Sequence, residues 1–165
     1  MDEPVIIADA GPLIALAKLD RLDLLSAFFT EILVPEAVSQ ECLTDASRTD
    51  TQRIQETIGR GAFRVVAVPE SPRLRAIRRL LDSGEAEALV LAEQLRAPVL
   101  MDERRGRIES QRMGVRVIGT GALFVAAKRR GLIDEVGPLL ALLVENGYRI
   151  SERLQLALLK MSGEA

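Results

Sequence analysis

Acidic side chains directly follow two apolar runs of the chain. Asp9 comes after residues 5–8, and Asp102 with Glu103 comes after residues 98–101. In an open parallel sheet, ligands bind beyond the carboxyl ends of the strands. If both runs are strands of one such sheet, these acids are predicted to lie together at its edge, where they could take part in chemistry.

Two further acids are predicted to reach the same edge from helices. Glu41 lies six residues after Pro35, a residue suited to the start of a helix, and Glu85 follows Gly84 at the start of another. Taken singly, these acids also have structural explanations. Asp82 and Glu85 have the spacing of a capping box, and Glu41 could be a solvated helix residue. Only the convergence of the acids favours a functional site.

The predicted cluster has the composition of a site for a hard divalent cation. Carboxylates that lie close together raise one another's pKa or require a cation, and oxygen ligands favour Mg²⁺ or Mn²⁺. Such sites serve phosphoryl chemistry, in which metal ions activate water and stabilise the leaving oxygen. The predicted catalytic residues, which are also the predicted metal ligands, are Asp9, Glu41, Glu85 and Asp102. Glu103 is predicted as an additional metal ligand.

Arginine dominates the basic residues, with 19 Arg against 3 Lys, and its planar guanidinium group suits phosphate. Arg104, Arg105 and Arg107 directly follow the acids at 102–103 and are predicted to bind a substrate phosphate. Thr120, which follows the last apolar run, is predicted to act with them or to support a metal ligand. The basic residues within 73–79 and 128–130 are expected to form solvated, salt-bridged helix faces.

The composition excludes several other kinds of site. The 165 residues include no histidine, which rules out Ser-His-Asp and Cys-His catalysis, and the single cysteine, Cys42, is expected in the core. There is no Walker-type phosphate loop, and aromatic residues make up only 3% of the chain, so base-stacking platforms are not expected. The net charge of −2 conceals an acidic segment, residues 1–50 with 10 acids and 3 bases, and an Arg-rich remainder that could meet phosphate.

The chain shows no targeting or membrane signal. Its N-terminus lacks the basic region typical of a signal peptide, and its apolar runs are far shorter than the roughly 20 residues of a membrane span. With one cysteine, no internal disulfide can form. We therefore expect a cytoplasmic protein that does not contact membranes.

Short apolar runs alternate with stretches of helical periodicity. Strands are predicted at residues 5–8, 32–34, 64–68, 98–101 and 115–118. Helices are predicted at residues 12–17, 22–29, 36–43, 52–58, 72–81, 84–95, 104–112, 122–130, 133–146 and 151–161. This alternation predicts one α/β domain over residues 1–165, with a central parallel sheet of four to five strands and helices on both faces. The C-terminal helices, at about 133–162, are expected to pack on it.

An ordered set of motifs resembles the PIN-domain family, and in particular a PIN-like subgroup related to the VapC-type toxins of toxin–antitoxin modules. The matching stretches are IADAGPLIAL (7–16), VPEAVSQE (34–41), GEAEA (84–88), LMDERRGR (100–107), VIGT (117–120) and AKRRGLI (127–133). Each motif is weak alone, but together they cover nearly the whole chain in the family's order.

This resemblance implies a metal-dependent, single-strand-directed ribonuclease that uses Mg²⁺ or Mn²⁺. The family's four acids fall on Asp9, Glu41, Glu85 and Asp102, with Glu103 able to share the last role. Two positions depart from the family pattern: Ala10 stands where many members have a hydroxyl residue, and Glu85 stands where Asp is common. The resemblance also implies a small antitoxin partner that covers the site, and a homodimer.

Two alternatives to a ribonuclease remain open at this point. The same fold could be a catalytically degenerate module that binds RNA or a partner protein without turnover. A phosphatase with Asp9 as nucleophile is less favoured, because Gly11 occupies the position where such enzymes have a second aspartate.

Overall fold

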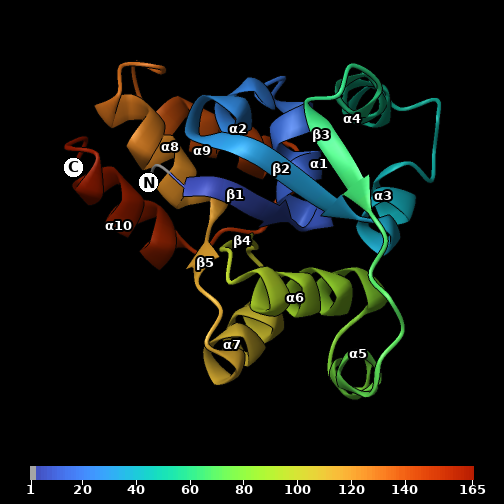
Figure 1. Cartoon of the computed structure of the whole chain (residues 1–165). Helices are drawn as coiled ribbons and strands as arrows, with labels where there is room; N and C mark the ends of the chain where they lie inside the picture. Colours follow the sequence, from blue (N-terminus) through green and yellow to red (C-terminus); the bar gives the residue numbers. More distant parts are fainter. Residues whose placement is uncertain (1–2) are drawn as a thin grey trace.

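The computed structural model describes residues 3–165, and its centre is a five-stranded parallel sheet. The strands are β1 (Glu3–Ala8), β2 (Phe29–Pro35), β3 (Phe63–Val66), β4 (Val99–Leu100) and β5 (Val117–Ile118). Their order across the sheet is β3-β2-β1-β4-β5 (Figure 1). The chain therefore builds outward from β1 to one side, then returns to place β4 on the other side, which makes the β1/β4 boundary a topological switch point.

Ten helices connect and cover the strands in the described part of the chain. They are α1 (Ala10–Lys18), α2 (Asp23–Phe28), α3 (Glu36–Cys42), α4 (Thr49–Gly59), α5 (Pro72–Arg78), α6 (Ser83–Leu95), α7 (Arg104–Met113), α8 (Thr120–Arg129), α9 (Gly137–Glu145) and α10 (Glu152–Met161). Within residues 3–165, none of these helices combines the length and the apolar character that crossing a bilayer requires.

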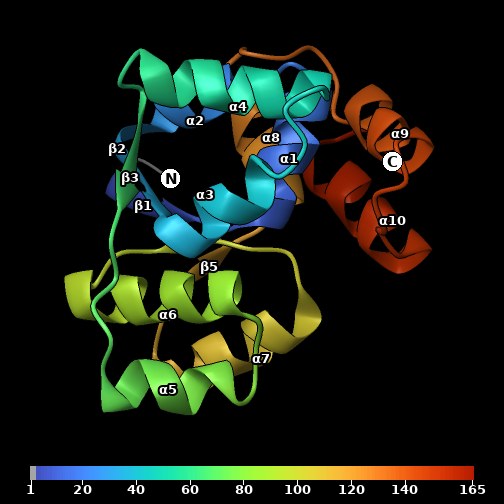
Figure 2. The same ribbon diagram turned by 90° about the vertical axis from the view of Figure 1, so that its right-hand side faces the viewer.

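Alternation along the strands divides the core into two layers, one on each face of the sheet. Ile6 and Ala8 point into the cluster formed with α1, α2 and α8, whereas Ile7 points into the cluster formed with α5 and α6. Successive side chains of a strand face opposite sides, so a strand buried on both faces has to be apolar throughout. Figure 2 shows α5, α6 and α7 below the sheet and α1, α2, α4 and α8 above it. The predicted α/β fold with helices on both faces is confirmed.

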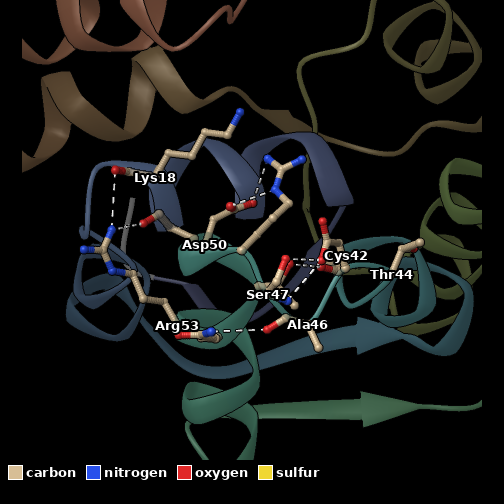
Figure 3. A network of polar contacts seen from close by, with 12 residues as sticks. Lys18, Cys42, Thr44, Ala46, Ser47, Asp50 and Arg53 are labelled. Carbon is tan, nitrogen blue, oxygen red and sulfur yellow. Dashed lines mark hydrogen bonds and ion pairs between the residues drawn. The ribbon is translucent and has the colours of Figure 1, made fainter.

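Polar contacts fix the connection between α3 and α4 and hold α4 against α1 (Figure 3). The Thr51 hydroxyl donates to the carbonyl of Cys42 at 3.2 Å, and the Arg53 guanidinium donates to the carbonyl of Ala17 at 2.7 Å. Cys42 itself is buried, as predicted, and burial raises the pKa of its thiol to about 12. These contacts anchor the C-terminal end of α3, the helix that carries Glu41.

The C-terminal helices pack onto α8 and are tied to it by the penultimate residue. The Glu164 carboxylate accepts hydrogen bonds from the backbone N–H groups of Val136 and Gly137, both at 2.8 Å, and from Lys128 at 2.9 Å. The Leu158 side chain fills the space over Gly121, where even a Cβ would overlap it. α9 and α10 are thereby held in place, with the connection between them at the carboxyl edge of the sheet.

Element boundaries differ from the predictions at a few places, each with a physical reason. Phe29 begins β2, where its backbone pairs with Glu3, instead of ending the preceding helix. α9 begins at Gly137, because Pro138 suits the first turn and the N–H groups before it are occupied by Glu164. The strand predicted at 115–118 shortens to β5, since the N–H of Val115 bonds instead to the carbonyl of Ser110.

Candidate active site

Asp9 and Asp102 lie at the topological switch point of the sheet. Asp9 follows β1 and precedes α1, and Asp102 follows the neighbouring strand β4. The backbone N–H of Asp9 donates to the carbonyl of Leu100 at 3.0 Å, which ties the two strand ends together. The expectation that these two acids share one edge of the sheet is therefore met.

A cleft of about 610 Å³ opens at this edge. Six carboxyl groups line it, from β1, α3, α6 and the start of α7 and their adjoining loops: Asp9, Glu41, Asp82, Glu85, Asp102 and Glu103. Among residues 3–165, none of the six forms an ion pair with Lys or Arg. All five acids predicted from the sequence thus lie in one cleft, joined by Asp82.

Asp9 is the most deeply placed acid, with only 5% of its surface exposed. Burial raises the pKa of its carboxyl to about 7, and the charges of Asp82, Glu41 and Asp102 add to the increase. A hydrogen bond from the backbone of Ala10 acts in the opposite direction. A buried carboxylate facing like charges is costly when ionised, and a bound cation would remove that cost.

Glu85 lies over the first turn of α7, where a glycine leaves room for it. A Cβ at Gly106 would overlap the Met101 side chain and lie 3.4 Å from Oε2 of Glu85. Burial raises the pKa of Glu85 to about 8, and a hydrogen bond with the Asp82 side chain and the charges of Asp82, Asp9 and Glu103 add to it. Burial also raises the pKa of Glu41, with Asp82 as the second cause.

Asp82 both caps a helix and faces the cleft. Its Oδ1 accepts a hydrogen bond from the backbone N–H of Glu85 at 2.8 Å, so the capping role considered for this pair belongs to Asp82. The Glu85 side chain is left to line the cleft. A Cβ at Gly84 would lie 3.1 Å from Oε2 of Glu41, which shows how closely α3 approaches the start of α6.

Hydrogen bonds from two elements orient Asp102. The backbone N–H of Thr120 donates to Oδ1 at 2.9 Å, and the Thr120 hydroxyl donates to Oδ2 at 2.6 Å. The Tyr148 hydroxyl, from the α9–α10 connection, also donates to Oδ2. Thr120 is 1% exposed, so it orients this carboxylate by hydrogen bonds and is too buried to contact a substrate. Of its two predicted roles, support of a metal ligand is the one that the geometry fits.

The donor set of the cleft fits a hard divalent cation in its chemistry. Every ligand atom is a carboxylate oxygen, and mutual repulsion together with burial raises the pKa of three of the acids. As the side chains stand, no three acids within residues 3–165 are spaced to hold a metal ion at once. Ligation of one cation by three of these acids would therefore require side chains to rotate.

The arginines divide as predicted into paired helix faces and a separate group beside the acids. On α5, Arg78 bonds Glu70 at 2.7 Å and Arg73 bonds Glu93 at 2.8 Å, and Lys128 on α8 bonds Glu164. Arg104, Arg105 and Arg107 on α7 are exposed and have no ion pair with any residue of 3–165. Arg104 lines the carboxylate cleft, Arg105 a smaller pocket beside Glu85, and Arg107 a groove beside Asp102.

Sequence reasoning missed three residues of the cleft: Asp82, Tyr148 and Arg149. The spacing of Asp82 from Glu85 indicates only a helix cap. Tyr148 and Arg149 come from the α9–α10 connection, 46 residues beyond Asp102 in the case of Tyr148. Nothing local in the sequence marks that connection as part of the site, so only the tertiary packing of α9 and α10 could reveal it.

Comparison with known proteins agrees with this architecture. A family model described as DUF3368: PIN domain matches residues 5–164. Among solved structures, the chain is similar to a PilT N-terminus domain protein from the hyperthermophilic archaeon Sulfolobus solfataricus P2. The TM-score is 0.56 and the identity 15%, covering 74% of this chain and 92% of that one. None of the curated proteins compared with the chain matches it.

The fold and the acid-lined cleft at its switch point therefore define a nuclease-type α/β domain. The chain belongs to the PIN-domain family.

Proposed function

We propose that this protein is a metal-dependent endoribonuclease that hydrolyses RNA phosphodiester bonds with Mg²⁺ or Mn²⁺. The observation that supports this best is the single cleft lined by six carboxyl groups, none of which has a Lys or Arg ion pair within residues 3–165. Burial and neighbouring acids raise the pKa of Asp9 to about 7, and a bound cation would favour its ionised form. Phosphoryl transfer is the chemistry that such all-oxygen sites serve.

Each residue has a distinct part in this proposal. Asp9, Glu41, Glu85 and Asp102 hold the cation, and Glu103 at the rim extends the ligand set. A bound divalent cation supplies activation of water and neutralisation of charge on the phosphate. Thr120 keeps the Asp102 carboxylate in one orientation through its N–H and hydroxyl.

Arginines at the mouth of the cleft place the phosphate. Arg104 and Arg149 both line the cleft, and neither forms an ion pair with the residues of 3–165. A guanidinium can donate two parallel hydrogen bonds to a phosphate, which orients it as well as attracting it. Arg105 and Arg107 extend the positive surface along α7.

Cleavage of RNA by the purified protein in the presence of Mn²⁺ tests the proposal, with the Asp9→Asn variant for comparison. We expect the wild-type protein to cut internal phosphodiester bonds and the variant to lose this activity while keeping its circular dichroism spectrum. Equal cleavage by both proteins would show that a contaminant or another site is responsible.

A second candidate is the catalytically degenerate module that binds RNA or a protein without turnover. It is favoured by the spacing of the acids, because no three of them in the described chain are poised to hold a metal together. Calorimetric titration with Mg²⁺ and Mn²⁺ separates the two candidates. Binding of Mn²⁺ supports the enzyme, whereas no binding at millimolar metal and no RNA cleavage support the module.

We further propose that the protein is the toxin of a toxin–antitoxin pair, acts in the cytoplasm and forms a homodimer. The partner would be a small antitoxin that covers the acid-lined cleft. A basic side chain of the antitoxin could enter the cleft and pair with its carboxylates. Expression of the chain alone, and together with the product of any short open reading frame beside its gene, tests this. Growth arrest that the neighbour relieves supports the toxin role, and growth unaffected by the chain alone contradicts it.

A further inference from the structure

A second hollow adjoins the carboxylate cleft. It is a groove of about 810 Å³ between α7 and the start of α10, along the outer edge of β5. Figure 1 shows β5 between these two helices. The volume lies within the range of about 300–1,000 Å³ that is typical of small-ligand sites.

The groove adjoins the carboxylate cleft. Asp102 and Arg104 line both hollows. The α9–α10 connection borders both hollows as well: Tyr148 and Arg149 line the cleft, and Ser151 lines the groove. A ligand held in the groove would therefore lie immediately beside the acids.

The walls of the groove combine a cation with apolar surface. Arg107, on α7, is exposed and without an ion pair among the residues of 3–165, and its guanidinium lies near the backbone of Gly119. Opposite it, Leu154 on α10 is 42% exposed, and Ile108 on α7 is also 42% exposed. The Gln111 amide at the rim has no hydrogen bond within the described chain. A phosphate, a flat apolar ring and a base edge are the three groups that such a surface matches.

On this basis, and resting on the proposed ribonuclease function, we propose that the α7–α10 groove binds the nucleotide next to the scissile phosphate in single-stranded RNA. Arg107 contacts its phosphate, and Leu154 and Ile108 contact its base. The groove shares Asp102 and Arg104 with the cleft, and this adjacency favours a nucleotide over a peptide in this position. A duplex would not fit, because the base has to leave its stack to enter the groove.

Binding of fluorescent single-stranded oligonucleotides tests the proposal without any cleavage step. Every protein carries Asp9→Asn, so the RNA stays intact, and affinity is followed by fluorescence anisotropy. Arg107→Gln is expected to weaken binding about tenfold and to reduce the slope of log affinity against log salt by about 0.7, the value of one single-strand phosphate contact. In the Arg107→Gln variant, lengthening the oligonucleotide at one end should no longer increase its affinity.

Matched variants on neighbouring surfaces provide controls. Arg75→Gln removes an exposed arginine of α5 that lies 3.9 Å from Glu70, and Leu156→Glu alters an exposed leucine of α10 that does not line the groove. Both are expected to bind RNA as the parent does. Leu154→Glu places a negative charge in the groove, leaves the fold intact because the residue is exposed, and is expected to weaken binding at least as much as Arg107→Gln.

Unchanged RNA affinity in both Arg107→Gln and Leu154→Glu would overturn the proposal. Conversion of a dimer to a monomer by Leu154→Glu, with RNA affinity unchanged, would show instead that the groove is an interface between copies of the chain. The proposed ribonuclease function is tested independently of the groove. If the wild-type protein never cuts RNA but binds it through Arg107 and Leu154, the groove proposal is supported and the ribonuclease proposal is contradicted.

Discussion

The hydroxyl of Tyr148 donates a hydrogen bond to the Oδ2 atom of Asp102 and so joins the C-terminal helices to the acid-lined cleft. Thr120 donates to both oxygens of the same carboxylate, through its backbone N–H and its hydroxyl. Asp102 is thus held in one orientation by three donors from two separate elements. Partners that orient a ligating carboxylate in this way influence metal affinity even though they do not touch the metal.

Tyr148→Phe removes one of these donors and keeps the ring. We expect the affinity for Mn²⁺ to fall about 10- to 100-fold, because Asp102 becomes free to rotate. Calorimetric titration measures the affinity directly. Thr120→Ser keeps its hydroxyl and is the matched control, for which a change of less than about threefold is expected. Mn²⁺ affinity equal to the wild type in Tyr148→Phe would show that Thr120 alone orients Asp102.

Metal affinity is expected to rise with pH. Burial and neighbouring carboxylates raise the pKa of Asp9 to about 7 and that of Glu85 to about 8, and a cation must displace these protons to bind. The apparent Mn²⁺ affinity should therefore increase up to about pH 8, and binding at about pH 6 should release protons. Titration in two buffers of different ionisation enthalpy counts the protons. An affinity that stays constant over this range would contradict the description of the cleft.

The metal-free protein is expected to lose stability as the pH rises from 3.8 to about 7. Asp9 binds its proton more tightly in the folded state, where its pKa is about 7, than in the unfolded chain, where it is 3.8. This contribution to stability is fully present below 3.8 and is lost as the pH rises through 7. Chemical denaturation in the presence of a chelator measures the effect. Saturating Mn²⁺ should restore the stability at high pH, because it binds only the folded state.

Asp9→Asn is expected to stabilise the metal-free protein at about pH 8 by roughly 2 kcal/mol, since it removes a buried charge that faces Asp82, Glu41 and Asp102. The free energy of unfolding in urea with chelator present measures this. At about pH 4 the difference should nearly vanish, because Asp9 is then protonated. A destabilised variant at about pH 8 would mean that the ionised Asp9 makes favourable contacts that outweigh its repulsion by the neighbouring acids.

Glu164 is expected to stabilise the attachment of α9. Burial tends to raise the pKa of its carboxyl, but hydrogen bonds from Gly137, Val136 and Lys128 outweigh it and lower the pKa to about 2. Its contribution is therefore present above the ordinary value of 4.5 and is lost as the pH falls toward 2. Glu164→Gln should reduce the free energy of unfolding by about 1–3 kcal/mol at neutral pH. An equal reduction of the free energy of unfolding by Glu164→Gln at about pH 2 would show that the ionised carboxylate is not the source of this stability.

The strands and the acids that follow them were predictable because their signals are local. An apolar run that ends in an acid, such as the one before Asp9, indicates a strand that is buried on both faces. The acid also marks the carboxyl edge of the sheet, where ligands bind. Boundaries were harder where one apolar run serves two elements. Residues 22–29 pass from α2 directly into β2, and periodicity alone cannot say that Phe29 pairs with Glu3 in the sheet.

The contribution of the C-terminal connection to the cleft was not predictable from the sequence. Tyr148 reaches Asp102 only because Glu164 and Leu158 fix α9 and α10 against α8, and these contacts join residues far apart in the chain. The division of the arginines was predictable in outline, since acids that pair with Arg73 and Arg78 lie on neighbouring segments. That Arg104 and Arg107 line two adjoining hollows required the structure.

The initial rate of cleavage of a single-stranded RNA, measured against Mn²⁺ concentration, tests the central claim most directly. Wild type, Asp9→Asn and the surface control Arg75→Gln are compared after their folding has been checked by circular dichroism. We expect a rate that saturates with Mn²⁺ in the wild type and the control, vanishes with chelator, and falls at least about 100-fold in Asp9→Asn. Cleavage that persists in chelator, or that is equal in wild type and Asp9→Asn, would contradict the assignment of the carboxylate cleft as a metal-dependent nuclease site.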